Sequence, residues 1–150
     1  MLNLIHSLFE ELNRSGIGYC HWKSNMNLAE SLDGATDIDV LVCRQDASCF
    51  RNILAESGFR PAINMDGKAF PAVEHHFALD ETSGHLVHVH AYYRVITGES
   101  LTKNYHLPLE TMLLQNSRQE NGVKLPTKAA ELVIYTLRMM LKHTALVELV

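Results

Sequence analysis

The feature that most constrains this chain is the run Asp-Ile-Asp-Val-Leu-Val at residues 37–42. Its β-branched residues favour a strand. Side chains at positions i and i+2 of a strand point to the same face, so Asp37 and Asp39 project together. Two adjacent carboxylates repel, and burying one without a partner is costly. A divalent cation resolves both problems, and Mg²⁺ prefers carboxylate and phosphate oxygens. In the alternative interpretation, Asp37 caps a turn and Asp39 sits at a solvated position of the strand.

The segments around this run mix helix and strand signals without a regular order. Apolar residues at helical spacing, β-branched runs and turn residues set the boundaries. The sequence predicts helices at 4–12, 27–32, 46–57, 109–118 and from 127 onward, strands at 17–22, 38–42, 59–63, 72–79 and 85–93, and irregular stretches at 65–71 and 97–108. This order favours an α+β fold over a regular βαβ alternation.

Composition narrows the classes of protein. The chain has 150 residues, of which 47% are hydrophobic and 20% charged, which suits one domain with a core. A net charge of -4 without a Lys/Arg cluster argues against a broad nucleic-acid surface. No apolar run approaches the length of a membrane span. The three cysteines form no Cys-x-x-Cys pair and no signal peptide is evident, so we expect reduced thiols and a cytoplasmic location.

Two segments together resemble a known superfamily. Residues 19–24 read Tyr-Cys-His-Trp-Lys-Ser, and Gly34 precedes the acidic run at 37–42. This arrangement is similar to the head of the DNA polymerase beta-like nucleotidyltransferases, in which a strand ends in Gly-Ser or Gly-Gly and a helix leads to an Asp-x-Asp strand. It most resembles an uncharacterised bacterial group with a Lys-Ser or Lys-Gly turn and a later Asp-x-His strand. The downstream segments 73–76, 88–90 and 125–126 fit that group in order.

The resemblance implies a nucleotidyltransferase fold, with a mixed β-sheet flanked by helices and followed by a C-terminal helix. It implies Mg²⁺ (or Mn²⁺) and a nucleoside triphosphate as ligands. The implied catalytic residues are Asp37, Asp39 and His88, and the implied nucleotide-binding residues are Lys23, Ser24 and Asn25. The sequence departs from the family twice, because Lys23 replaces the first glycine of the turn and His88 stands where a third carboxylate is expected.

Histidines of the two strands at 72–79 and 85–93 suggest a second feature. If the turn between them makes a simple hairpin, His75 lies opposite His90 and Phe77 opposite His88. Directly opposed residues share a face. His75, His88 and His90 then lie together on one face of the sheet, which we expect to be the face of Asp39.

A cluster of imidazoles and carboxylates suits Mn²⁺, Zn²⁺ or Ni²⁺ better than Mg²⁺. The predicted metal ligands are Asp37, Asp39, His88 and His90. The alternative is that these histidines only form hydrogen bonds within a half-buried sheet. A register slip would disperse the cluster and make Glu74, otherwise on the opposite face, the substitute third carboxylate.

Three functions follow from these patterns. The first is a metal-dependent nucleotidyltransferase that moves NMP from an NTP to an acceptor hydroxyl. The second is a nucleotidyltransferase-fold module that binds without turnover, because the third carboxylate is missing. The third is a transition-metal hydrolase or sensor that uses the histidines and an aspartate.

The end of the chain supports a further expectation. Residues 1–126 form the predicted domain, and 127–150 form a helix that packs on the same domain. That helix stays apolar at Ala145, Leu146, Val147 and Val150, without a terminating Gly or Pro. Proteins of the group it resembles often continue, in some cases into a kinase-like region. We therefore expect either a downstream domain or a homodimer to cover these side chains.

Overall fold

The computed structural model describes residues 1–63, 72–98 and 105–142, with side chains described as far as Leu141. The helices are α1 (Asn3–Arg14), α2 (Leu28–Leu32), α3 (Ala47–Glu56), α4 (Glu110–Gln115) and α5 (Lys128–Lys142), with 3-10 turns η1 (Asn25–Asn27) and η2 (Arg44–Asp46). The strands are β1 (Tyr19–His21), β2 (Ile38–Val42), β3 (Arg60–Pro61), β4 (Val73–Leu79), β5 (Leu86–Tyr92), β6 (Val95–Thr97), β7 (Tyr105–Leu107), β8 (Ser117–Glu120) and β9 (Val123–Pro126). No helix in these ranges is long and apolar enough to cross a membrane.

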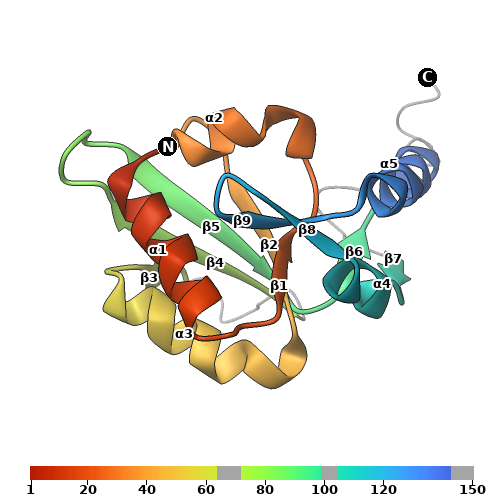
Figure 1. Cartoon of the computed structure of the whole chain (residues 1–150), viewed down its shortest axis with the longest axis horizontal. Coiled ribbons are helices and arrows are strands. Elements are labelled where there is room, and N and C mark those ends of the chain that lie inside the picture. The colour runs from red at the N-terminus through yellow and green to blue at the C-terminus, as the bar shows by residue number, and fades with distance from the viewer. Residues whose placement is uncertain (64–71, 99–104, 143–150) are drawn as a thin grey trace.

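A mixed five-stranded sheet in the order β1-β2-β5-β4-β3 forms the centre of the molecule (Figure 1). β2 and β5 run parallel, and the other neighbours are antiparallel. The α+β class and the strand at Ile38–Val42 are therefore confirmed. This strand pairs with the preceding strand β1. The predicted hairpin register is also confirmed, because His75 lies opposite His90 and Phe77 opposite His88.

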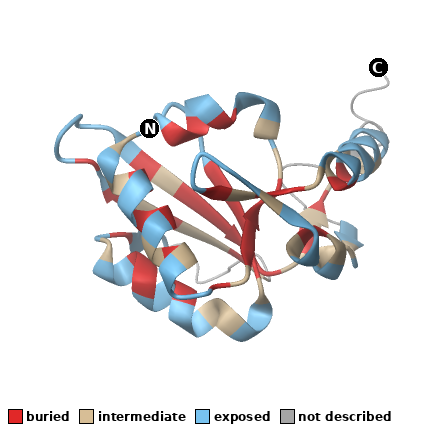
Figure 2. Ribbon diagram, in the orientation of Figure 1, coloured by how far each residue is buried: buried red, intermediate tan, exposed pale blue. Residues whose placement is uncertain are grey.

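Helices α1 and α3 lie side by side against one face of this sheet (Figure 1). Their apolar stripes bury Leu8, Leu12 and Phe50 against Ile38 and Val40 of β2, all of them less than 1% exposed. β1 and β2 are accordingly buried along their whole length, and β5 along most of its length (Figure 2). The apolar side chains of β2 that alternate with the acidic ones are thus buried in the core on this face.

The opposite face of the sheet is covered in part. A second apolar cluster joins Trp22, Leu41 and Tyr92 to Leu113 of α4 and Ile134 of α5. The described part of α5 thus packs on the second face of the sheet through Ile134. The apolar side chains at 145–150, which were expected to be covered by a downstream domain or a homodimer, lie outside the described residues. The rest of this second face carries the acidic and imidazole side chains.

Two hairpins differ from the sequence-based expectation. β6 and β7 pair within the stretch expected to be irregular. The helix expected over 109–118 ends at Gln115, and its last residues begin the β8–β9 hairpin. Asn121 and Gly122 have φ of 51° and 81°, which is the left-handed pair that a two-residue hairpin turn requires. The Asn-Gly signal therefore overrode the helical spacing before it. β3 is shorter than predicted and spans only Arg60–Pro61.

Glu74 lies on the α3 face, as the hairpin register requires. Its carboxylate accepts hydrogen bonds from Arg51 at 3.0 Å and from the Tyr93 hydroxyl at 2.9 Å, and lies 3.2 Å from Nε2 of His76. Burial raises the pKa of Glu74, but His76, Arg51 and Tyr93 more than offset it and bring the pKa to about 2. Glu74 is thus a structural ion-pair partner, remote from the acidic residues of β2.

We expect Glu74→Gln to make acid unfolding less steep. The pKa of Glu74 is lowered in the folded chain, so its stabilising contribution is present above the unfolded value of about 4.3. That contribution is lost as the pH falls toward about 2. Denaturant unfolding followed by circular dichroism at a series of pH values should show the variant less stable at pH 7, with the difference from wild type shrinking below pH 4.5. A constant difference would contradict the assignment.

Candidate functional site

Asp37 and Asp39 occupy the start of β2 on the sheet face opposite α1 and α3. The Asp39 side chain is 8% exposed, whereas that of Asp37 is 55% exposed. Asp39 pairs in register with His90 of the parallel strand β5. The buried carboxylate is therefore surrounded by protein groups, and the interpretation of Asp39 as a solvated strand residue is wrong.

Asp39 belongs to a compact polar network. The Lys23 ammonium group lies 2.8 Å from its Oδ1, and Nδ1 of His90 lies 3.3 Å from the same oxygen. Lys23 also donates to the Tyr92 hydroxyl at 2.7 Å, which in turn lies 3.0 Å from Nδ1 of His90. The residue that replaces the first glycine of the family's turn thus places a cation directly on the buried carboxylate.

The charges in this network shift one another. Burial raises the pKa of Asp39, but the hydrogen bond to His90 and the charge of Lys23 prevail and hold the pKa below its usual range. Burial raises the pKa of Tyr92, and the charge of Asp39 raises it further. Asp39 is therefore ionised and Tyr92 neutral at pH 7.

Asp37 has a separate partner. Nδ1 of His88 lies 2.8 Å from its Oδ1, and Nε2 of His88 lies 3.0 Å from Nδ1 of His75. As predicted, Asp39 lies close to a histidine of the later strand, which is His90. His88 contacts Asp37 instead. The two carboxylates thus lie on one face and are held by different imidazoles.

The imidazoles form a stack along this face. The ring centroids of His75 and His90 are 4.2 Å apart, and those of Phe77 and His88 are 4.3 Å apart with an interplanar angle of 9°. His90 continues the series to Tyr92 at 4.4 Å. Nearly parallel rings direct their nitrogen lone pairs along parallel planes, so they do not converge on one point.

This arrangement bears on the predicted metal. Among the residues that the structure describes, no group of three or more His, Cys, Asp or Glu side chains is placed to hold a metal ion. Lys23 lies where a cation beside Asp39 would sit, and the stacked rings give no shared coordination point. The side chains as they lie therefore do not fit a Mg²⁺ or a transition-metal centre.

The turn after β1 was predicted to bind nucleotide phosphates. Ser24 is exposed and has a φ of 61°, a strained left-handed conformation for a residue with a side chain. Asn25 is already engaged, since it contacts His21 and donates to Glu131 of α5 at 2.8 Å. Of the three predicted residues, Lys23 lies beside Asp39, Ser24 faces solvent, and Asn25 ties the turn to the C-terminal helix.

Sequence reasoning missed one residue of this site, Arg138 of α5. Its guanidinium carbon lies 5.7 Å from the Trp22 ring centroid, and it forms no ion pair with any residue in the described ranges. Burial lowers the pKa of Arg138, while the charge of Asp39 raises it. The only available signal was its helical spacing from Ile134, which places both residues on one face of α5.

No family model, curated protein or solved structure matches this chain. Membership of the nucleotidyltransferase superfamily therefore stays a prediction from the sequence, based on residues 19–24 and 37–42. What the site offers chemically is a sheet face with a neutralised buried carboxylate, an additional guanidinium and a row of imidazoles.

Proposed function

We propose that this chain is a nucleotidyltransferase-like module that binds the phosphates of a nucleoside triphosphate beside Asp39 without turning it over. The observation that carries the proposal is the pair of cations gathered there. Lys23 lies 2.8 Å from Asp39 and neutralises it. Arg138 adds a second positive charge, and it forms no direct ion pair with a carboxylate in the described part of the chain. Guanidinium groups bind phosphate oxygens through two parallel hydrogen bonds.

The aromatic residues beside these cations support the binding of phosphates rather than of a base. Trp22 is 1% exposed and Tyr92 is fully buried, packed edge to face at 5.1 Å. Neither ring offers a free surface on which a nucleobase could stack. The module is therefore expected to bind different nucleotides with similar affinity.

Binding without turnover follows from the same geometry. Nucleotidyl transfer depends on metal ions that bridge substrate phosphates and neutralise developing charge. A lysine ammonium at the buried carboxylate, together with imidazoles in place of a third carboxylate, removes the acidic ligands that such ions require. Lys23 and Arg138 supply positive charge for the phosphates instead.

Titration of the wild-type chain with ATP, GTP, CTP and UTP by calorimetry tests this proposal. We expect binding of comparable strength for all four, and an increase of about tenfold in Kd for Arg138→Gln, since a charge-assisted hydrogen bond contributes about 1.5–3 kcal/mol. Lys128→Gln is the matched control, because Lys128 is a cation of the same helix whose side chain is 77% exposed. A wild-type chain that binds none of the four nucleotides would overturn the proposal.

Nucleotidyl transfer is the second candidate function. It is favoured by the placement of Asp37 and Asp39 on one face, next to the histidines of the parallel strand. Incubation with α-labelled NTP, Mg²⁺ or Mn²⁺ and candidate acceptors distinguishes the two candidates. If the wild type transfers the label and Asp39→Asn does not, the function of this face is catalysis and not binding alone.

A further inference from the structure

A cavity of about 550 Å³ lies at the opposite end of β2 from Asp37. It opens where the parallel strands β2 and β5 end, beside Val42 and Tyr93, and α4 forms its other wall. Its volume is in the range of small-molecule sites. In sheets with parallel strands, ligands commonly bind just outside the carboxyl ends of those strands. The position and size of this cavity are therefore those of a ligand site separate from the Asp39 face.

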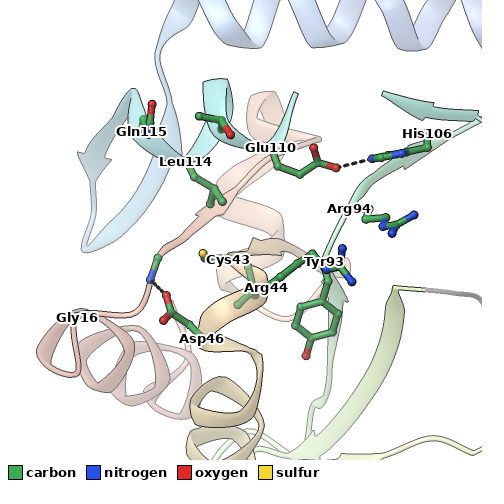
Figure 3. A pocket seen from close by; sticks show the side chains of 13 residues that line it. Gly16, Cys43, Arg44, Asp46, Tyr93, Arg94, His106, Glu110, Leu114 and Gln115 are labelled. Carbon is green, nitrogen blue, oxygen red and sulfur yellow. Dashed lines mark hydrogen bonds and ion pairs between the residues drawn. The ribbon is translucent and has the colours of Figure 1, made fainter. Parts of the chain in front are cut away.

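The acidic side chains of this cavity are engaged by its own walls. Asp46 accepts a hydrogen bond from the backbone N–H of Gly18 at 2.9 Å. Glu110 accepts one from the backbone N–H of Val95 at 2.8 Å and lies 2.8 Å from Nε2 of His106 (Figure 3). Both carboxylates therefore have hydrogen-bond donors other than an arginine.

Two arginines of the same cavity have no such partner. Arg44 begins η2 directly after β2, and Arg94 follows β5 by two residues. Neither guanidinium group forms a hydrogen bond or an ion pair with any residue in the ranges that the structure describes. The side chain of Arg44 extends toward the side of the cavity where Arg94 and Tyr93 lie (Figure 3). Arg44 is exposed and Arg94 is partly buried, so both guanidinium groups are accessible to an anion that enters the cavity.

One wall of this cavity depends on a close approach between the backbone at Gly18 and the residues Cys43 and Asp46. A Cβ added at Gly18 would lie 3.0 Å from Cβ of Cys43 and 3.1 Å from Oδ2 of Asp46. The chain before β1 can therefore approach η2 this closely because residue 18 is glycine. That approach holds Asp46 on a backbone N–H and away from Arg44.

We propose that this cavity is a binding site for a phosphorylated small molecule, with Arg44 and Arg94 holding the phosphate group and His106 at its rim. Arginine recognises phosphate through paired N–H donors, and two guanidiniums match the charge of a phosphate monoester. The site does not depend on nucleotide binding at Asp39, because no residue is shared between the two.

Amide NMR spectra recorded during titration with inorganic phosphate, and separately with glycerol phosphate, test this site. We expect saturable shifts at Gly18, Arg44 and Arg94 with both probes, and tighter binding of glycerol phosphate if the cavity also holds the organic part. The double variant Arg44→Gln/Arg94→Gln should weaken binding at least tenfold. Arg14→Gln is the matched control, since this exposed arginine is ion-paired with Glu11 on α1.

Each other outcome counts against the site. Shifts spread over the surface, or an equal response in the double variant and in Arg14→Gln, would mean that phosphate binds without using the cavity. Arg138→Gln separates this proposal from the proposed function, because it should weaken nucleotide binding and leave the phosphate shifts at Gly18 unchanged. Circular dichroism of each variant verifies that the fold is retained.

Discussion

Replacing Lys23 by methionine is expected to lower the free energy of unfolding by about 3 kcal/mol or more, because it leaves a buried carboxylate without its cation. The Asp39 side chain is 8% exposed and that of Lys23 is 15% exposed, so solvent screens neither charge well. The methionine keeps the apolar stem of the lysine and removes its charge. Equilibrium unfolding in urea, followed by circular dichroism and by the fluorescence of the single tryptophan, Trp22, measures the loss.

A double-mutant cycle distinguishes loss of charge pairing from loss of packing. Lys23→Met/Asp39→Asn should recover a large part of the stability lost in Lys23→Met, since the uncompensated charge is then absent. The deficit of Lys23→Met should also shrink as the pH falls. Without Lys23 only His90 lowers the pKa of Asp39, so the carboxylate of the variant becomes protonated at a higher pH than that of the wild type. A double variant less stable than both single variants would show that Lys23 acts through packing.

Replacing Phe50 by alanine is expected to destabilise the chain by about 3–5 kcal/mol, the usual cost of emptying an aromatic side chain from a core. Phe50 is fully buried on the inner side of α3, in the cluster that joins α1 and α3 to β2. The polar side chains of the candidate site lie on the opposite face of the sheet from this cluster. The loss should therefore appear in stability while nucleotide binding, measured below the unfolding midpoint, stays unchanged.

Leu132→Ala serves as the control for Phe50→Ala. Leu132 also lies on a helix but is 66% exposed, so its truncation should change the free energy of unfolding by less than about 0.5 kcal/mol. Urea unfolding of both variants makes the comparison. Equal effects would mean that α3 does not pack on the sheet as described.

Local patterns predicted the central part of the fold well. The β-branched run at Ile38–Val42 is a strand, and its apolar residues Ile38 and Val40 are buried in the core that α1 and α3 form. The hairpin register followed from the turn between β4 and β5, and it placed His75 opposite His90. These results depend on contacts between residues near in sequence, or on the two-residue period of a strand.

Competing local signals account for the errors. The helical spacing at 109–118 and the Asn-Gly pair at 121–122 made opposite demands on Ser117 and Arg118. The structure shows that the turn prevailed, because Val123 and Leu125 of β9 gain a fully buried position only if the β8–β9 hairpin forms. Propensity over a few residues is weak beside the burial of two apolar side chains.

The sequence by itself determined the α+β class, the acidic strand and the shared face of Asp37 and Asp39, since each follows from periodicity within one segment. Tertiary structure alone decided how those carboxylates are paired. Lys23 reaches Asp39 because β1 runs antiparallel to β2 and returns the turn to its start, and Arg138 arrives from a helix about a hundred residues later. Long-range packing buries Asp39, and a buried carboxylate is stable only beside a cation or hydrogen-bond donors. The same packing therefore explains why Asp39 is paired.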